Sequence, residues 1–363
     1  MLRRIALCAA IALFPLAAPA QQDDKGYLAT LLEENLSGAG RTVTIDGFSG
    51  ALSSRAAIQR LTIADGQGVW LTLNGISLDW SRSALLSGEV SVNELTADEI
   101  IVARKPIVPE DTPTPEAGGF SLPELPVSIT IGKLAAGRIT LGPDILGEDF
   151  SATLSASVVL AAGEGVVDAR LTRIDDGPAA EIALKGSYAN DSRQLVLDLS
   201  ASEGQGGIAA RMIGIPGTPA TDLAVQGSGP IDDFSAQLRL ATDGQDRLAG
   251  TVAVKADSFA VDVSGDVAPL FLPDYAEFFG QQVALKATGQ QTPAGGLSLT
   301  NLDLSARSLS LQGAVDLAPD GLPTRLDVTG QIAAPDGSRV LLPTSDRIEI
   351  DRADLSLAFD STT

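Results

Sequence analysis

The sequence contains no histidine, and its single cysteine, Cys8, lies close to the N-terminus. A chain without histidine lacks the commonest general base and the commonest zinc ligand. Beyond Cys8 there is no thiol to act as a nucleophile or to form a disulfide. These absences argue against hydrolases built on histidine or cysteine and against most zinc enzymes. The sequence therefore predicts no enzymatic activity and no cofactor.

Basic residues and aromatic residues are both scarce. The chain has 25 Lys and Arg against 46 Asp and Glu, which gives a net charge of −21. Such a chain is repelled by the phosphates of nucleic acids, and no basic cluster with interleaved aromatics occurs, so we predict no nucleic-acid partner. Aromatic residues make up 4% of the chain and apolar residues 44%. An apolar surface must therefore be built from Leu, Val, Ile and Ala.

No apolar run reaches the length of about 20 residues that a transmembrane helix needs. The longest one, Ile5–Leu16, follows Arg3 and Arg4 and precedes the small residues Ala18-Pro19-Ala20. This order of a basic, an apolar and a small-residue region is typical of a secretory signal peptide. We predict that residues 1–20 are a signal peptide, with an N-terminal membrane anchor as the alternative.

Alternation of apolar and polar residues is the main pattern present, and it centres on the stretch from Trp70 to Trp80. Asn74-Gly75 in its middle predicts a two-residue hairpin turn, because both residues of a type I′ turn need positive φ. This hairpin pairs Leu73 with Ile76, Leu71 with Leu78 and Val69 with Trp80. Side chains alternate with period 2 along strands, so all six lie on one apolar face.

Short alternating runs separated by turn signals continue from residue 127 to 363, which predicts a meander of antiparallel strands. Before them, Gly26–Ser37 predicts a short helix, which is either a lid over the first sheet edge or a plain packing helix. Residues 88–104 and 126–142 form a weak repeat, in which Leu95 aligns with Leu134 and Ile100 with Ile139.

Two segments interrupt the alternation. Lys105–Pro126 contains six prolines and predicts a linker, either a spacer or an extended partner-binding segment. Residues 267–283 hold much of the aromatic content and predict a short helix opening at Pro273, which caps the sheet or forms a small local core. The domain prediction is therefore a signal at 1–20, a helix and β module at 21–104, a linker at 105–126 and a repetitive β region at 127–363.

Three features suggest chemistry only weakly. The acidic pairs Asp175-Asp176 and Asp232-Asp233 could serve acid–base catalysis or bind calcium, but each lies in a turn, where Asp is favoured for bonding to the backbone. Gly204–Gly207 is similar to a phosphate loop, but no helical pattern follows it, so we do not predict anion binding there.

The region from residue 47 to 102 resembles the N-terminal region of TamB-type translocation and assembly proteins, within the AsmA-like group. The resemblance covers about a fifth of the chain. Its residues, in order, are Gly47, Gly50-Ala51-Leu52, Ile58–Ile63, Asp65-Gly66, Val69-Trp70-Leu71, Leu78-Asp79-Trp80, Ala84-Leu85-Leu86, Gly88, Leu95-Thr96-Ala97, Ile100 and Val102.

This resemblance implies the rest of the functional prediction. The implied fold is all-β, a long antiparallel meander forming a curved, groove-like sheet, with a short N-terminal helix and one or two small helices. The implied role is phospholipid transport between inner and outer membranes, outer-membrane protein translocation and assembly, or both. The implied location is the periplasm, attached to the inner membrane and reaching towards the outer membrane. The lipid-groove candidates are Val69, Leu71, Leu73, Ile76, Leu78 and Trp80.

The implied partners are phospholipid acyl chains, the inner membrane and a TamA-like outer-membrane insertase. Family members are longer, so we expect the insertase contact in a C-terminal region that this sequence does not include. Alternation alone fits a β-sandwich equally well. The alternative prediction is therefore a secreted structural or adhesin-like β-sandwich with no lipid role.

Overall fold

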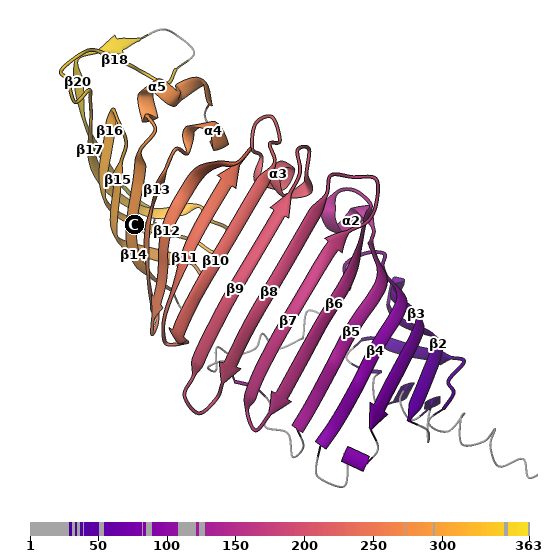
Figure 1. Cartoon of the computed structure of the whole chain (residues 1–363). Coiled ribbons are helices and arrows are strands. Elements are labelled where there is room, and N and C mark those ends of the chain that lie inside the picture. Colours follow the sequence, from indigo (N-terminus) through magenta and orange to yellow (C-terminus); the bar gives the residue numbers. More distant parts are fainter. Residues whose placement is uncertain are drawn as a thin grey trace, which may run out of the picture.

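The computed structural model describes residues 29–30, 33–34, 37–38, 40–50, 54–81, 83–84, 89–107, 121–122, 128–271, 273–292, 295–344 and 348–361. An 18-stranded sheet dominates them, and Figure 1 shows it as one long, curved ribbon of strands that does not close into a barrel. The all-β, groove-like meander predicted from the sequence is confirmed. The predicted signal segment 1–20 lies outside the described residues, as do 108–120 and 123–126 of the predicted linker.

Strand boundaries follow the alternating runs of the sequence. The strands are β1 (Thr42–Asp46), β2 (Arg55–Asp65), β3 (Gly68–Ser81), β4 (Glu89–Val102), β5 (Ser128–Leu141), β6 (Phe150–Ala161), β7 (Glu164–Arg173), β8 (Ala180–Ala189), β9 (Gln194–Glu203), β10 (Thr221–Pro230), β11 (Asp233–Thr242), β12 (Gln245–Lys255), β13 (Ser258–Gly265), β14 (Val283–Gln291), β15 (Leu297–Ser305), β16 (Leu309–Leu317), β17 (Pro323–Ala333), β18 (Val340–Leu341), β19 (Glu349–Ile350) and β20 (Arg352–Asp360). The short helices are α2 (Pro143–Leu146), α3 (Ile208–Ile213), α4 (Ala268–Phe271), the 3-10 helix η2 (Pro273–Tyr275) and α5 (Ala276–Phe279).

From β1 to β17 each strand pairs with the next one along the chain, and β20 then pairs with β17. The pairs are antiparallel except β4 with β5, which are parallel. The turn signals from residue 127 to 363 fall at the ends of strands or between them. Asp243 and Gly244, for example, both have positive φ, at 49° and 72°, as the type I′ turn between β11 and β12 requires.

The predicted hairpin at Asn74-Gly75 is wrong. Both residues lie in the middle of β3, which runs unbroken from Gly68 to Ser81 between β2 and β4. Only Gly75 has positive φ, at 61°, so the pair cannot make a type I′ turn. The register of β3 against β2 and β4 continues unchanged across Gly75. The rows of paired residues through Leu73 and through Leu78 reach Ala152 and Ala156 of β6, so the apolar side chains before and after Gly75 lie on the same face.

The weak repeat in the sequence has a structural meaning. Because β4 and β5 are parallel, equivalent positions of the two copies lie side by side, and Leu95 pairs with Leu134 as Ile100 pairs with Ile139. The register of β5 against β6 shifts after Ile131 and again after Ala136. Each shift lets the three-residue spacing of apolar residues on β5 match the two-residue spacing on β6.

The two described ends of the predicted linker attach to different turns. At its start, Arg104 forms an ion pair with Asp65 at the end of β2, and the Ile107 N–H donates to the same carboxylate. Near its end, Leu122 exchanges two hydrogen bonds with the side chain of Asn190 in the turn between β8 and β9. Whether the linker also binds a partner stays a prediction.

Of the two interpretations of Gly26–Ser37, the described residues favour a lid over the first sheet edge. Residues 29–30 and 33–34 are helical, and the Glu33 carboxylate accepts a hydrogen bond from the Ile45 N–H of the edge strand β1. The Ser37 hydroxyl oxygen accepts another from the Val43 N–H at 2.9 Å. These two side chains therefore cover the edge of the sheet at β1.

At Gly250, φ is 158° and a Cβ would lie 2.1 Å from the carbonyl oxygen of Asp262, so only glycine lets β12 and β13 approach this closely.

The helices follow β5, β9 and β13, which run in the same direction, and Figure 1 shows α2, α3, α4 and α5 along one rim of the sheet. Within the described parts of the chain, no helix has the length and apolar character to cross a membrane.

Candidate functional site

One ladder of paired residues crosses every strand of the 18-stranded sheet except β1, and it contains only Ala, Val, Leu and Gly. We call it the apolar ladder. Its members, from β2 to β20, are Ala56, Leu78, Leu95, Leu134, Ala156, Ala169, Leu184, Leu199, Val225, Leu238, Gly250, Val263, Leu285, Leu304, Leu311, Gly330 and Leu355. Residues two positions away on each strand are mostly apolar too, so the ladder is the midline of a continuous apolar face.

The opposite face is polar. The row next to the apolar ladder, which includes Ser155, Arg170 and Ser200, carries small and polar side chains. Exposed cross-strand ion pairs such as Arg170 with Glu181 lie on this side. The sheet therefore separates an apolar face from a water-facing one along its whole length.

The apolar face is only half buried over most strands. On β9, Leu195, Leu197, Leu199 and Ala201 are intermediate in exposure, while the residues between them are exposed. Two packed sheets, as in the sandwich alternative, would bury such a face. Outside the large sheet, the described residues form only the two-stranded β18–β19 pair, so no second sheet of comparable size covers it.

Five of the six lipid-groove candidates share the apolar face. Leu71 and Leu73 pair with Val102 and Ile100 of β4, Leu78 and Trp80 pair with Leu95 and Val92, and Ile76 pairs with Ile58 of β2. Val69 is the exception. It pairs with Ala64 beyond a register shift, whereas Leu71 pairs with Ile63, and it is 49% exposed. Trp70 is an extra residue of β3 at this register shift. The side chain of Val69 therefore lies on the opposite face from the other five candidates.

A buried arginine lies at the end of the apolar face, on the rim of the sheet that carries the helices. Arg173 continues the apolar parity of β7, pairs with Ala152 of β6, and has a side chain that is only 3% exposed. Its guanidinium lies 5.3 Å from the centre of the Phe150 ring, over the small cluster that Phe150 and Ala152 form with Ile208. The end of the apolar face is thus covered by a charged group whose stem packs on hydrocarbon.

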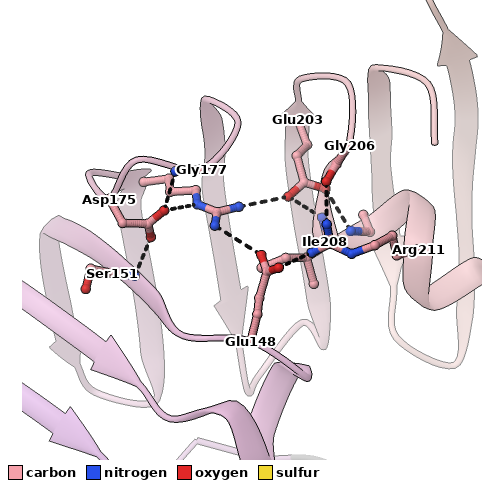
Figure 2. Close-up of polar contacts among 10 residues, drawn as sticks. Glu148, Ser151, Asp175, Gly177, Glu203, Gly206, Ile208 and Arg211 are labelled. Carbon is pink, nitrogen blue, oxygen red and sulfur yellow. Dashed lines mark hydrogen bonds and ion pairs between the residues drawn. The ribbon is translucent and has the colours of Figure 1, made fainter.

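Three carboxylates converge on this guanidinium, as Figure 2 shows. Arg173 Nε donates to Asp175 at 2.7 Å, Nη2 donates to Glu148 at 3.1 Å, and Nη1 lies 3.7 Å from Glu203. Within the described residues Nη1 is buried without a hydrogen-bond partner. The cluster carries more negative than positive charge, so it does not favour an additional anion.

The same cluster holds α3 in place. Glu203 accepts hydrogen bonds from the N–H groups of Ile208 and Ala209, both at 2.7 Å, and Arg211 forms an ion pair with Glu148 (Figure 2). The expectation that no helix follows Gly204–Gly207 is therefore wrong. The N-terminal N–H groups of this helix are occupied by a carboxylate of the chain itself.

The described residues contain no cluster able to hold a metal ion, and one aspartate of each acidic pair binds an arginine instead: Asp175 binds Arg173 and Asp232 binds Arg193. Burial opposes ionisation of Asp175, but hydrogen bonds from the Ser151 and Gly177 N–H groups and from Arg173 hold its pKa below the ordinary value. A hydrogen bond from Arg193 likewise lowers the pKa of Asp232. Both aspartates remain ionised. Asp175 stabilises the rim of the sheet, and Asp232 stabilises the turn in which it lies.

The predicted cap at residues 267–283 lies beside α3. Leu270 of α4 is almost fully buried and packs with Ala210 and Ile215, and Leu240 of β11 packs against this cluster. The segment thus forms a small local core and also covers part of the same rim. Both interpretations of its sequence, a cap on the sheet and a local core, therefore apply. A shallow hollow of about 420 Å³ lies on the polar side, over residues such as Gln226, Gln237 and Arg239.

The alternation on β3 predicts the part of the apolar face that five of the candidates share, but not how far that face extends. The alternation on each later strand was the available signal for the other members of the apolar ladder. Arg173 was also missed, although an arginine that takes an apolar place in the pattern Val167, Ala169, Leu171 marks a buried charge. The chain matches no protein-family model, and the comparisons with curated proteins and solved structures found no similar protein.

Proposed function

We propose that this protein binds the acyl chains of phospholipids along the apolar face of its sheet and carries them passively between membranes. The observation that supports the proposal best is the apolar ladder, which runs without a polar residue from Ala56 to Leu355. A structural protein has no need to keep such a path continuous and half exposed, because exposed apolar patches of this size favour aggregation.

The free energy of acyl-chain burial is sufficient for this role. Transfer of one methylene from water to an apolar surface is worth about 0.8 kcal/mol, so a dozen methylenes contribute roughly 10 kcal/mol before the entropic costs of binding. Ladder side chains are aliphatic and make no directional bonds, so a chain can move along the face without breaking specific contacts. At about 4.8 Å per strand, the path along the sheet is roughly 80 Å long.

The resemblance of residues 47–102 to TamB-type proteins extends the proposal to a location and a process. In this proposal the protein acts in the periplasm, attached to the inner membrane, and supports outer-membrane assembly by supplying phospholipid. A role in outer-membrane protein translocation and assembly, with a TamA-like insertase as partner, is part of the same proposal. No described residue is assigned to that contact.

Native mass spectrometry of the purified protein tests lipid binding. We expect phospholipid to copurify with the wild-type chain. Leu199→Asp places a charge on the apolar ladder and should abolish most of this occupancy, because a charge is strongly disfavoured beside acyl chains. Ser200→Asp, one residue along β9 on the exposed polar face, is the matched control and should leave occupancy unchanged.

The same experiment includes the result that overturns the proposal. A lipid-free wild-type protein, or equal lipid content in the Leu199→Asp and Ser200→Asp variants, would favour the structural role instead. Circular dichroism of each variant shows whether a loss of lipid reflects a loss of fold.

A further inference from the structure

The two rims of the apolar face are built differently. The rim that carries α2, α3, α4 and α5 (Figure 1) is here called the helix rim, and the apolar face ends there in a row of polar residues. In this row Glu203 of β9 pairs with Thr221 of β10, which pairs with Thr242 of β11. Thr221 and Thr242 are 7% and 3% exposed, and the side chains of Arg173 and Glu203 are 3% and 9% exposed. This end of the face is therefore shielded from water.

Three cations of the helix rim are bound to carboxylates of the chain itself. Arg173 lies among three carboxylates. Arg211 forms an ion pair with Glu148, and Arg247 donates to Asp266 at 2.7 Å. A lipid phosphate at any of these arginines would have to displace a carboxylate and leave it without its partner, which is costly where the groups are buried. The helix rim is therefore an unfavourable place for a phospholipid headgroup.

The opposite rim, here called the turn rim, joins the strands from β6 to β13 by short turns. These are residues 162–163, 190–193, 231–232 and 256–257. In the row of the apolar face beside these turns, Val254 of β12 pairs with Phe234 of β11 and with Phe259 of β13. Val254 is 39% exposed, and the two phenylalanines are half-buried. Apolar surface therefore reaches water at the turn rim, unlike at the helix rim.

Both phenylalanine rings of this row lie over a glycine of a neighbouring strand. A Cβ at Gly227 would lie 2.6 Å from Phe234 Cζ, and a Cβ at Gly289 would lie 2.9 Å from Phe259 Cζ. The missing side chains leave room for the rings to lie along the sheet. The rings thus give the face a broad apolar surface directly beside the turns.

The width of the apolar face suits one acyl chain laid parallel to the strands. On β9 its apolar residues extend from Leu195, beside the turn rim, to Ala201, next to Glu203 of the polar row. This distance is about 20 Å at about 3.4 Å per residue. The acyl chains of one bilayer leaflet fill half of a hydrocarbon core about 30 Å thick, or about 15 Å. A chain of ordinary length therefore fits between the two rims.

We propose that phospholipids lie across the sheet, parallel to its strands, with their headgroups at the turn rim and their acyl-chain ends towards the helix rim. This inference rests on the proposed function, because it gives an orientation to the lipid bound on the apolar face. The headgroup stays in water beside the turns, and the acyl chains beside it contact Phe234 and Phe259. Lipid can then move from strand to strand without its headgroup crossing the apolar face.

Two photoreactive phosphatidylethanolamines test this orientation in the purified full-length protein. One carries a diazirine at the end of an acyl chain, and the other carries it on the headgroup. Peptide mapping by mass spectrometry locates the adducts after irradiation. We expect the headgroup probe to label the turns at 190–193, 231–232 and 256–257. The chain-end probe should label residues next to the polar row, such as Leu223 and Leu240.

The outcomes separate the orientation from lipid binding itself. Headgroup adducts at the helix rim, or adducts of both probes spread evenly over the two rims, overturn the orientation and leave lipid binding intact. The absence of adducts from either probe overturns the proposed function, and the orientation with it.

A pair of lysine variants on β12 provides a second test. Val254→Lys places an ammonium beside the turn rim, where its flexible stem lets it reach water and the lipid phosphate. Leu248→Lys, at the position that pairs with Leu240, places the charge among the acyl-chain ends. In native mass spectrometry we expect Leu248→Lys to lower lipid occupancy by roughly tenfold, and Val254→Lys to change it by less than about twofold. Equal losses in the two variants overturn the orientation. The probe experiment uses the wild-type chain, so it does not depend on the folding of either variant.

Discussion

Arg173 gives the sharpest test of how the rim covers the apolar face. Replacing it with Leu keeps hydrocarbon over Phe150 but removes the only cation within bonding distance of Asp175 and Glu203 among the described residues. Arg170 on the same strand is the matched control. It points to the polar face, where it forms an exposed ion pair with Glu181.

The expected effects differ severalfold. Removing one partner of a buried ion pair typically costs 3–5 kcal/mol, because the remaining charges lose their compensation. Glu203 is nearly buried, whereas Glu148 is partly solvated and keeps its ion pair with Arg211. We therefore expect Arg173→Leu to destabilise the rim by about 3 kcal/mol, at the lower end of that range. Arg170→Leu should cost less than about 1 kcal/mol, as exposed pairs do.

Hydrogen exchange is the suitable assay, because a long sheet of sequential strands need not unfold in one step. Residues 203–214 include α3 and the carboxylate that binds its N-terminus. About 3 kcal/mol corresponds to roughly a hundredfold faster exchange in this segment. Equal exchange rates in the Arg173→Leu and Arg170→Leu proteins would refute the assigned role of the buried arginine.

Two further predictions concern positions away from the rim. Gly250→Ala should destabilise the protein by roughly 1–3 kcal/mol in urea unfolding, because its Cβ would meet the carbonyl oxygen of Asp262, whereas Gly66→Ala, with no atom within 4 Å, should be nearly neutral. Hydrogen bonds from Arg104 and the backbone hold the pKa of Asp65 well below its ordinary value, so its stabilising effect is present above the unfolded-state pKa and is lost as pH falls. Asp65→Asn should therefore lower the melting temperature at pH 7, with a difference that shrinks below about pH 4; a constant difference across that range would contradict the assignment.

Alternation was sufficient to predict most strands and the apolar face. On β9 every second residue from Leu195 to Ala201 is apolar, and the structure places these residues on one face. The topology at β3 could not be predicted in the same way. Asn74-Gly75 is a strong local turn signal, but only Gly75 has positive φ, and the pairing of β3 with β2 and β4 on both sides keeps the strand continuous through it.

The rim depends on contacts between residues distant in sequence. α3 is six residues long, too short for a helical period to show in the sequence, and it is held by Glu203 and by the ion pair of Arg211 with Glu148. Carboxylates from three separate connections and strand ends meet at Arg173, and no local pattern indicates that they converge. The apolar position that Arg173 takes in the alternation of β7 indicates that its side chain is buried. Which carboxylates it binds can be seen only in the tertiary structure.

Photo-crosslinking can show directly whether phospholipid lies along the apolar face. A photoreactive amino acid is placed on the apolar ladder at Leu78, Leu199 and Leu311, and on the polar face at Ser77, Ser200 and Ser310. We expect lipid adducts at the three ladder positions, on strands far apart in the sheet, and none at their neighbours. Adducts at equal levels on both faces, or no adducts on the ladder, would contradict a lipid path along the apolar face.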